Sequence, residues 1–189
     1  MQVLRSGNYR TMPWKNGGGV TTEVAIFPTA AGLADFHWRV SMATVAEDGS
    51  FSVFAEIDRT ISIIDGAGME LSVAKNAPVL LDQQSDPFAF DGGAATSAVL
   101  TAGPIVDLNV MTRRGRTTAS VRRVQAGEAL RFDGPCSLLL CHHSNLSFDE
   151  NGRVHRLGPL DSLLHQDPQP IAGMLVGEGT AFLIGFAPA

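Results

Sequence analysis

The stretch Thr60-Ile-Ser-Ile-Ile-Asp-Gly-Ala-Gly-Met-Glu-Leu-Ser-Val73 indicates the fold class of this chain. Its two arms are short, rich in apolar and β-branched residues, and separated by Asp65-Gly-Ala-Gly68. Such arms are typical of β-strands. The glycines tolerate a positive φ, which favours a turn between the arms. A strand, a turn and a strand in this order predict an all-β architecture.

The same pattern continues along the 189 residues in both directions. No helical period runs longer than about two turns, and only residues 160–165 are expected to form a short helix. Glu150-Asn-Gly-Arg153 is expected to form a hairpin turn. Many short strands at regular spacing predict a sandwich or a barrel. The other predicted strands cover residues 22–27, 36–42, 50–54, 98–100, 105–111, 119–124, 137–141 and 181–186.

Two segments, residues 60–90 and 137–172, share an order of features. Each runs through a strand, a turn, a second strand, a leucine-aspartate pair and an aspartate-proline pair. The shared order predicts an internal duplication, with two β-sandwich halves of similar length. Chance similarity between the two segments is the alternative.

Composition excludes several classes of protein. A hydrophobic content of 44% and a charged content of 17% are typical of a folded globular chain. With a net charge of −5 and no basic stripe, neither nucleic acid nor a membrane surface is an expected partner. The N-terminus lacks the apolar core of a signal peptide, and no membrane-spanning run follows. We therefore expect a cytoplasmic protein in which Cys136 and Cys141 remain core thiols.

The most unusual segment is Trp14-Lys-Asn-Gly-Gly-Gly-Val-Thr-Thr-Glu23. Three consecutive glycines allow a sharp turn or the close approach of a ligand. A P-loop is excluded because Lys15 precedes the glycines, and a dinucleotide loop because no helical pattern follows. Alternation in the strand after the glycines puts Thr21 and Glu23 on one face. This face either serves a site or faces water on an edge strand.

Two further strands carry a few polar side chains on one face only. In the first, Arg39 and Ser41 share a face. In the second, the shared face carries Asp107, Asn109, Met111 and Arg113. A solvated outer face usually carries many Lys, Glu and Thr residues. Single polar groups among small or apolar residues favour a partly apolar pocket instead.

Four segments follow one another in the first 115 residues or so: residues 14–23, 38–43, 49–54 and 107–113. In order and spacing they resemble the successive signatures of the HutD/Ves family. The resemblance implies a double cupin (bicupin) made of two jelly-roll-like β-sandwich or barrel halves. Residues 1–115 would form the N-terminal cupin half and residues 116–189 the C-terminal cupin-like half. An exchange of strands between the halves is left open.

The resemblance also carries an implied function. Proteins of this family often accompany the enzymes of histidine degradation. The resemblance therefore implies ligand binding linked to control of that pathway. The implied ligands are histidine, urocanate or formylated glutamate intermediates. One departure from the family pattern is Glu56, where glycine is expected, and it leaves the local turn and the role of Arg59 open.

The metal that many cupins bind is not expected here. Metal-binding cupins use a His-x-His pair, because alternate positions of a strand point into the barrel. None of the five histidines forms such a pair. His142 and His143 are neighbours, so in a strand they would face opposite sides. We expect neither a metal nor another cofactor.

The leading hypothesis is a metal-independent regulatory protein that binds a small carboxylate intermediate of histidine degradation, of the urocanate or formylglutamate type. In the first alternative, a metal-free cupin isomerase or hydrolase uses Glu23 as acid or base. In the second alternative, the chain is a protein-interaction module with a vestigial pocket. A homo-oligomer is left open. The expected ligand-binding residues are Trp14, Lys15, Asn16, Thr21, Glu23, Arg39, Ser41, Asn109 and Arg113.

Overall fold

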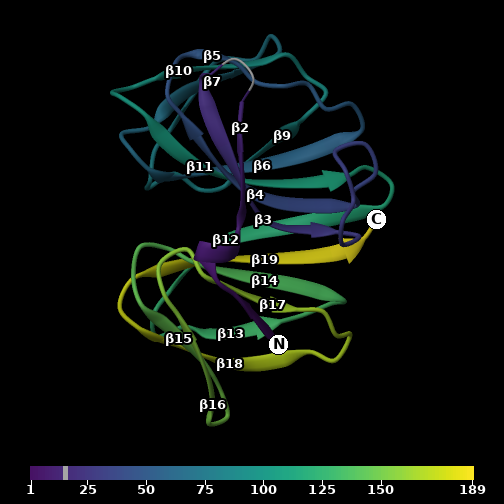
Figure 1. The fold of residues 1–189 in the computed structure, drawn as a ribbon, viewed down its shortest axis with the longest axis vertical. Coiled ribbons are helices and arrows are strands. Elements are labelled where there is room, and N and C mark those ends of the chain that lie inside the picture. The colour runs from purple at the N-terminus through teal and green to yellow at the C-terminus, as the bar shows by residue number, and fades with distance from the viewer. Residues whose placement is uncertain (15–16) are drawn as a thin grey trace. The chain divides into compact units, whose positions relative to one another are not determined.

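The computed structural model describes residues 1–14 and 17–189, and it confirms the all-β prediction (Figure 1). The described residues form strands and a single turn of 3-10 helix, η1 (Ser6–Asn8). Contacts divide the chain into two units. One unit is Arg10–Thr117, and the other combines Met1–Tyr9 with Thr118–Ala189.

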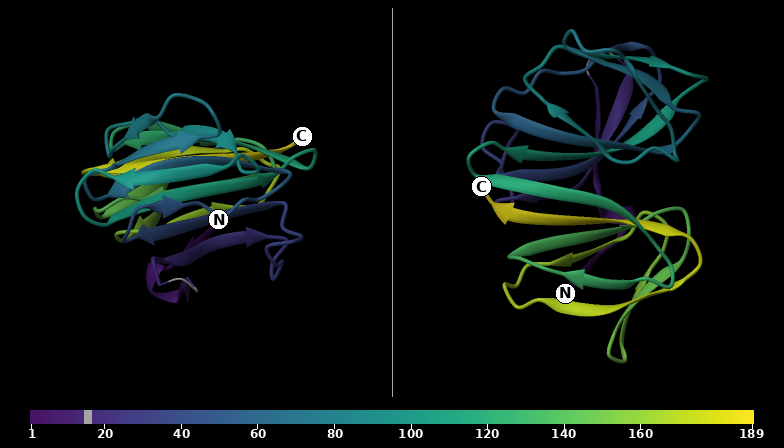
Figure 2. Two further views of the ribbon diagram at one scale, coloured as in Figure 1. Left: turned by 90° about the horizontal axis from the view of Figure 1, so that it is seen from above. Right: turned by 180° about the vertical axis from the view of Figure 1, so that it is seen from behind.

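The unit Arg10–Thr117 contains two antiparallel sheets, which Figure 2 shows as curved layers. The six-stranded sheet has the order β2-β3-β4-β11-β6-β9, and the four-stranded sheet has the order β5-β10-β7-β8. The first sheet comprises β2 (Arg10–Pro13), β3 (Gly19–Phe27), β4 (Trp38–Val45), β11 (Ile105–Arg113), β6 (Ile57–Asp65) and β9 (Phe88–Asp91). The second comprises β5 (Gly49–Ser50), β10 (Thr96–Leu100), β7 (Met69–Val73) and β8 (Val79–Leu81).

The core of this unit joins the inner faces of its two sheets. Ile61 and Ile63 of β6 belong to the same buried cluster as Met69 and Leu71 of β7. All four side chains are almost fully removed from solvent. Burial of such side chains is the main force that holds two sheets together.

The unit formed by Met1–Tyr9 and Thr118–Ala189 also contains two antiparallel sheets. The five-stranded sheet comprises β1 (Gln2–Leu4), β17 (Ser162–His165), β14 (Cys136–Cys141), β19 (Thr180–Pro188) and β12 (Thr117–Gln125) in that order. The four-stranded sheet comprises β13 (Ala129–Phe132), β18 (Ile171–Gly177), β15 (Leu146–Glu150) and β16 (Arg153–Leu157). Its core includes Phe132 and Phe148, whose rings meet edge to face with centroids 4.9 Å apart.

Two local predictions were wrong. Residues 162–165 form strand β17 rather than a helix, because they pair with both β1 and β14. Of the strand predicted over residues 50–54, only Ser50 is in β5. Residues 51–54 lie outside the strand, and Phe51 and Phe54 pack against two different core clusters.

Two other local predictions were confirmed. β15 and β16 form a hairpin in which Glu150 pairs with Arg153, and Asn151 and Gly152 both have positive φ. Both cysteines are free and buried. Burial raises the pKa of the Cys136 thiol to about 12, which keeps it protonated.

No helix of the described residues is long and apolar enough to span a membrane.

Candidate functional site

Strand register brings the predicted polar residues together on one face of the six-stranded sheet. Side chains of paired residues lie on the same face of adjacent strands. The first row across the sheet consists of Thr21, Ala43, Asp107 and Ile63. The second row consists of Glu23, Ser41, Asn109 and Ile61. The third row consists of Arg39, Met111, Arg59 and Phe90.

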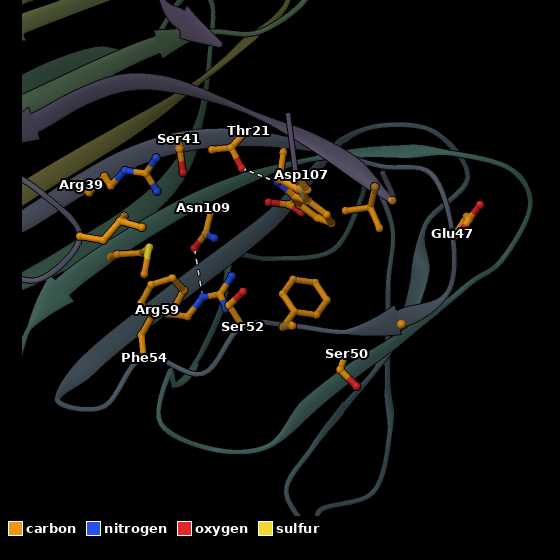
Figure 3. Close-up of a pocket in the computed structure, with 18 of the residues that line it drawn as sticks. Thr21, Arg39, Ser41, Glu47, Ser50, Ser52, Phe54, Arg59, Asp107 and Asn109 are labelled. Atoms are coloured by element: carbon orange, nitrogen blue, oxygen red, sulfur yellow. Dashed lines mark hydrogen bonds between the residues drawn. The ribbon is translucent and has the colours of Figure 1, made fainter. Parts of the chain in front are cut away.

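This face forms one wall of a cavity of about 610 Å³. The size suits a small organic ligand. Figure 3 shows Arg39, Ser41, Asn109 and Arg59 converging on this space from three strands. Its apolar lining includes the side chains of Trp14, Leu33, Ala43, Val45, Phe51, Phe54 and Met111.

Arg59 is the most confined cation of the cavity, with an exposed fraction of 4%. Its guanidinium carbon lies 5.1 Å from the ring centroids of both Phe51 and Phe90 and 6.0 Å from that of Phe54. Its Nε donates a long hydrogen bond of 3.4 Å to Oδ1 of Asn109. The aromatic faces stabilise the cation and hold it in place.

Burial has the largest effect on the pKa of Arg59. Burial lowers its pKa; the charge of Asp107 opposes this change, and the charge of Arg39 adds to it. Two arginines in one cavity therefore repel each other, and an anion between them would relieve the repulsion. A bound carboxylate is the kind of ligand that such a pair favours.

Asp107 is the buried carboxyl group of the same cavity, with an exposed fraction of 0%. Burial raises its pKa to about 7, and the nearby charge of Arg59 counteracts part of the rise. Neither carboxyl oxygen has a hydrogen-bond partner among residues 1–14 and 17–189. Burying a carboxyl without a hydrogen-bond partner costs free energy. Asp107 therefore marks a place where a ligand could supply the missing hydrogen bond.

Arg39 and Glu23 form an ion pair, with Arg39 Nε donating to Glu23 Oε2 at 2.7 Å. Arg39 lines the cavity, whereas Glu23 holds Arg39 through this ion pair and is not itself part of the lining. The bond uses only the Nε edge of the guanidinium. The two terminal amino groups of Arg39 are not consumed by it, so they are suited to an anionic ligand.

The glycine segment positions Trp14 against the sheet. Trp14 Nε1 donates a hydrogen bond of 2.8 Å to Oγ1 of Thr21, and both residues line the cavity. Gly17 has a positive φ of 77°. A Cβ on Gly19 would overlap the carbonyl oxygen of Thr44 and lie 2.9 Å from the indole ring of Trp14. Gly19 is thus required by packing. The predicted ligand residues Lys15 and Asn16 lie outside the described residues.

Arg113 does not line the cavity. It ends strand β11, and its guanidinium donates to the carbonyl oxygens of Phe36 at 2.9 Å and Ala34 at 2.8 Å. The guanidinium carbon also lies 5.4 Å from the ring centroid of Phe36. These contacts give Arg113 a structural role at the end of the strand.

Sequence reasoning did not include Arg59, Asp107 or the phenylalanines 51 and 54 among the site residues. The sequence could have indicated Asp107, because it shares a strand face with Asn109. It could have indicated Arg59 as well, since Arg59 alternates with isoleucines 61 and 63 on one strand face. Glu56, just before β6, has a φ of 62°, a conformation that favours glycine.

The histidines give no chelating arrangement among the described residues, where no group of three or more His, Cys, Asp or Glu side chains could hold a metal ion. Strand alternation does not apply to His142 and His143, because β14 ends at Cys141. His143 has a positive φ of 46°, and the two rings lie 4.0 Å apart.

Comparison with known proteins identifies the family. A model of the HutD family matches residues 6–183. The chain belongs to the HutD family. It is 35% identical to an uncharacterized 21.2 kDa protein in the hutC 3' region of Pseudomonas putida, over 93% of this chain and 92% of that one. It is 41% identical to the protein Ves of Citrobacter koseri, over 60% of each chain.

Solved structures agree with this assignment. HutD from Pseudomonas fluorescens SBW25 matches with a TM-score of 0.88 and 32% identity, over 100% of this chain and 98% of that one. A cupin 2 conserved barrel domain protein from Leptotrichia buccalis matches with a TM-score of 0.60 and 10% identity, over 95% and 96% of the two chains. The chain therefore has a cupin-like β-sandwich fold, and its family supports a role associated with histidine utilisation.

Proposed function

We propose that this chain is a metal-independent binding protein for a small carboxylate of histidine degradation, with a regulatory role. The observation that carries the proposal is the pair of buried arginines, Arg39 and Arg59, in one cavity of about 610 Å³. Buried cations favour the exchange of cavity water for an anion. The family's association with histidine utilisation supports carboxylates of the urocanate or formylglutamate type.

The apolar part of the cavity supports a flat or partly apolar ligand. Phe51, Phe54 and Met111 line the same space as the two arginines. Small-molecule sites usually combine an apolar lining with a few converging polar groups. Glu23, which the enzymatic alternative requires as acid or base, does not line the cavity and is ion-paired with Arg39. This pairing favours binding over turnover.

The test is calorimetric titration of urocanate and N-formylglutamate into the wild type, Arg59→Lys and Arg113→Lys. Lysine keeps the positive charge but loses the planar, multidentate donor group. Arg59→Lys is expected to weaken binding by roughly 10- to 100-fold, the scale of a charged hydrogen bond. Arg113→Lys is the matched control, because the same change is made outside the cavity, and it should bind like the wild type.

Three results would contradict the proposal. Equal affinity in all three proteins would remove Arg59 from the binding site. No heat with either compound would favour the protein-interaction alternative. If the wild type converts either compound to a product and Glu23→Gln does not, the enzymatic alternative would be established.

A further inference from the structure

Asp107 is the polar group of the cavity that the proposed function leaves unexplained. Its neighbours in the first row are Ala43 on β4 and Ile63 on β6, and neither offers a polar side chain. Thr21 is the next residue of the row, and its hydroxyl accepts a hydrogen bond from Trp14. Both oxygens of Asp107 lack a partner among residues 1–14 and 17–189.

The position of Asp107 relative to the arginines is set by the strand register. Arg39 and Arg59 belong to the third row, and Asp107 belongs to the first. Adjacent rows are separated by two residues, or about 7 Å along a strand. The Arg59 side chain reaches back to the second row, where it contacts Asn109. The cavity thus holds two cationic donors on the third row and a buried carboxyl acceptor on the first row of one sheet face (Figure 3).

We infer that Asp107 accepts a hydrogen bond from an N–H group of the bound carboxylate, and so selects ligands that carry both groups. This inference rests on the proposed function and names its ligand class. A ligand whose carboxylate contacts the arginines can extend along the sheet face to Asp107, whose row neighbours Ala43 and Ile63 are apolar. An imidazole, amide or similar N–H there satisfies the unpaired carboxyl, whereas an aprotic ring leaves it without a partner.

The other charged groups around the cavity do not replace Asp107. Glu23 on β3 is ion-paired with Arg39 on β4. Glu47 and Asp48 line the rim and are on the connection between β4 and β5, where both are exposed. Asp107 on β11 is the carboxylate that is both fully buried and part of the described cavity lining. A site that uses a buried acceptor discriminates strongly against ligands that lack the donor.

The experiment compares two probes of nearly equal shape, urocanate and 3-(furan-3-yl)acrylate. Both carry the same acrylate, but the furan ring has no N–H. Calorimetry at pH 8, above the pKa of about 7 for Asp107, should give wild-type binding roughly 10-fold or more tighter for urocanate, whose ring is neutral at this pH. In Asp107→Leu the two affinities should become equal, with the furan affinity no weaker than in the wild type.

Asp107→Leu is of similar size and suits the apolar flanks of residue 107, and circular dichroism and thermal unfolding establish that it folds. Asp107→Asn serves as a second variant, which keeps an acceptor oxygen and should retain part of the preference. Equal binding of the probes by the wild type, or an unchanged preference in Asp107→Leu, would overturn the inference and leave the proposed function standing. Failure of both probes to bind the wild type would overturn both.

Discussion

Asp107 shows how burial alone changes the chemistry of a common side chain. In an unfolded chain its carboxyl would ionise near pH 3.8, whereas in the folded protein the pKa rises to about 7. Arg59 is close enough to reduce this rise but donates its Nε hydrogen bond to Asn109. The protein therefore carries a carboxyl group that is largely protonated below neutral pH.

This raised pKa predicts a dependence of stability on pH. Between pH 3.8 and about 7 the unfolded chain releases the Asp107 proton while the folded protein retains it. The free energy of unfolding should therefore fall as the pH rises through this window, by an amount on the order of a few kcal/mol. Above the folded pKa the contribution is constant.

Urea unfolding of the wild type and Asp107→Leu at pH 5 and pH 8 measures this effect. Other carboxylates titrate equally in both proteins, so the difference between them isolates residue 107. The variant should gain stability relative to the wild type between pH 5 and pH 8. A difference that does not change with pH would show that Asp107 ionises normally.

At the scale of elements, the β3–β4 pair is the part of the sheet that supports Trp14. Gly19 opens β3, pairs with Val45 and leaves room for the indole ring beside Thr44. The ring then hydrogen bonds to Thr21 two residues further along the strand. At Gly19 the reason for glycine is therefore packing against Thr44 and Trp14, whereas the sequence had suggested a sharp turn or the close approach of a ligand.

Gly19→Ala should destabilise the protein by about 1–3 kcal/mol, the usual scale of overpacking. The added Cβ would meet the Thr44 carbonyl, which is backbone and cannot move aside easily, and the Trp14 ring at 2.9 Å. Gly49→Ala is the matched control, because it adds the same methyl group to β5 with nothing within 4 Å. Thermal unfolding of the two variants checks the prediction, and equal melting temperatures would contradict it.

At the scale of the whole molecule, the N-terminal residues complete the unit that contains the C-terminus. β1 pairs with β17, with Val3 opposite Leu163, and Val3 packs against the core cluster of that unit. Arg5 forms a 2.6 Å ion pair with Asp161, and Tyr9 Oη lies 2.8 Å from Ser162 Oγ. Without β1, strand β17 would become an edge of its sheet.

Deletion of residues 1–4 is therefore expected to destabilise this unit by about 2–3 kcal/mol, since it removes a short strand and the packing of Val3. Amide hydrogen exchange reports the two units separately. Exchange should become faster in β17 and β14 and remain unchanged in β4 and β11. Equal acceleration throughout, or none in β17, would contradict this assignment of β1.

Much of the site was predictable from local alternation, because side chains on a strand point to opposite faces by covalent geometry alone. That rule placed Thr21 with Glu23, Arg39 with Ser41, and Asp107 with Asn109. It could not reveal which strands are neighbours. Arg59 joined the site because β6 pairs with β11, a long-range contact that depends on the packing of the whole sheet.

By itself, the sequence determined the all-β class, the free cysteines and the faces of individual strands, since these depend on composition and on neighbours along the chain. Only the tertiary structure decided that Arg113 binds the Phe36 and Ala34 carbonyls instead of lining the cavity. It also decided that Asp107 is buried without a partner among the described residues. Burial and pairing arise between segments far apart in sequence, so no local pattern contains them.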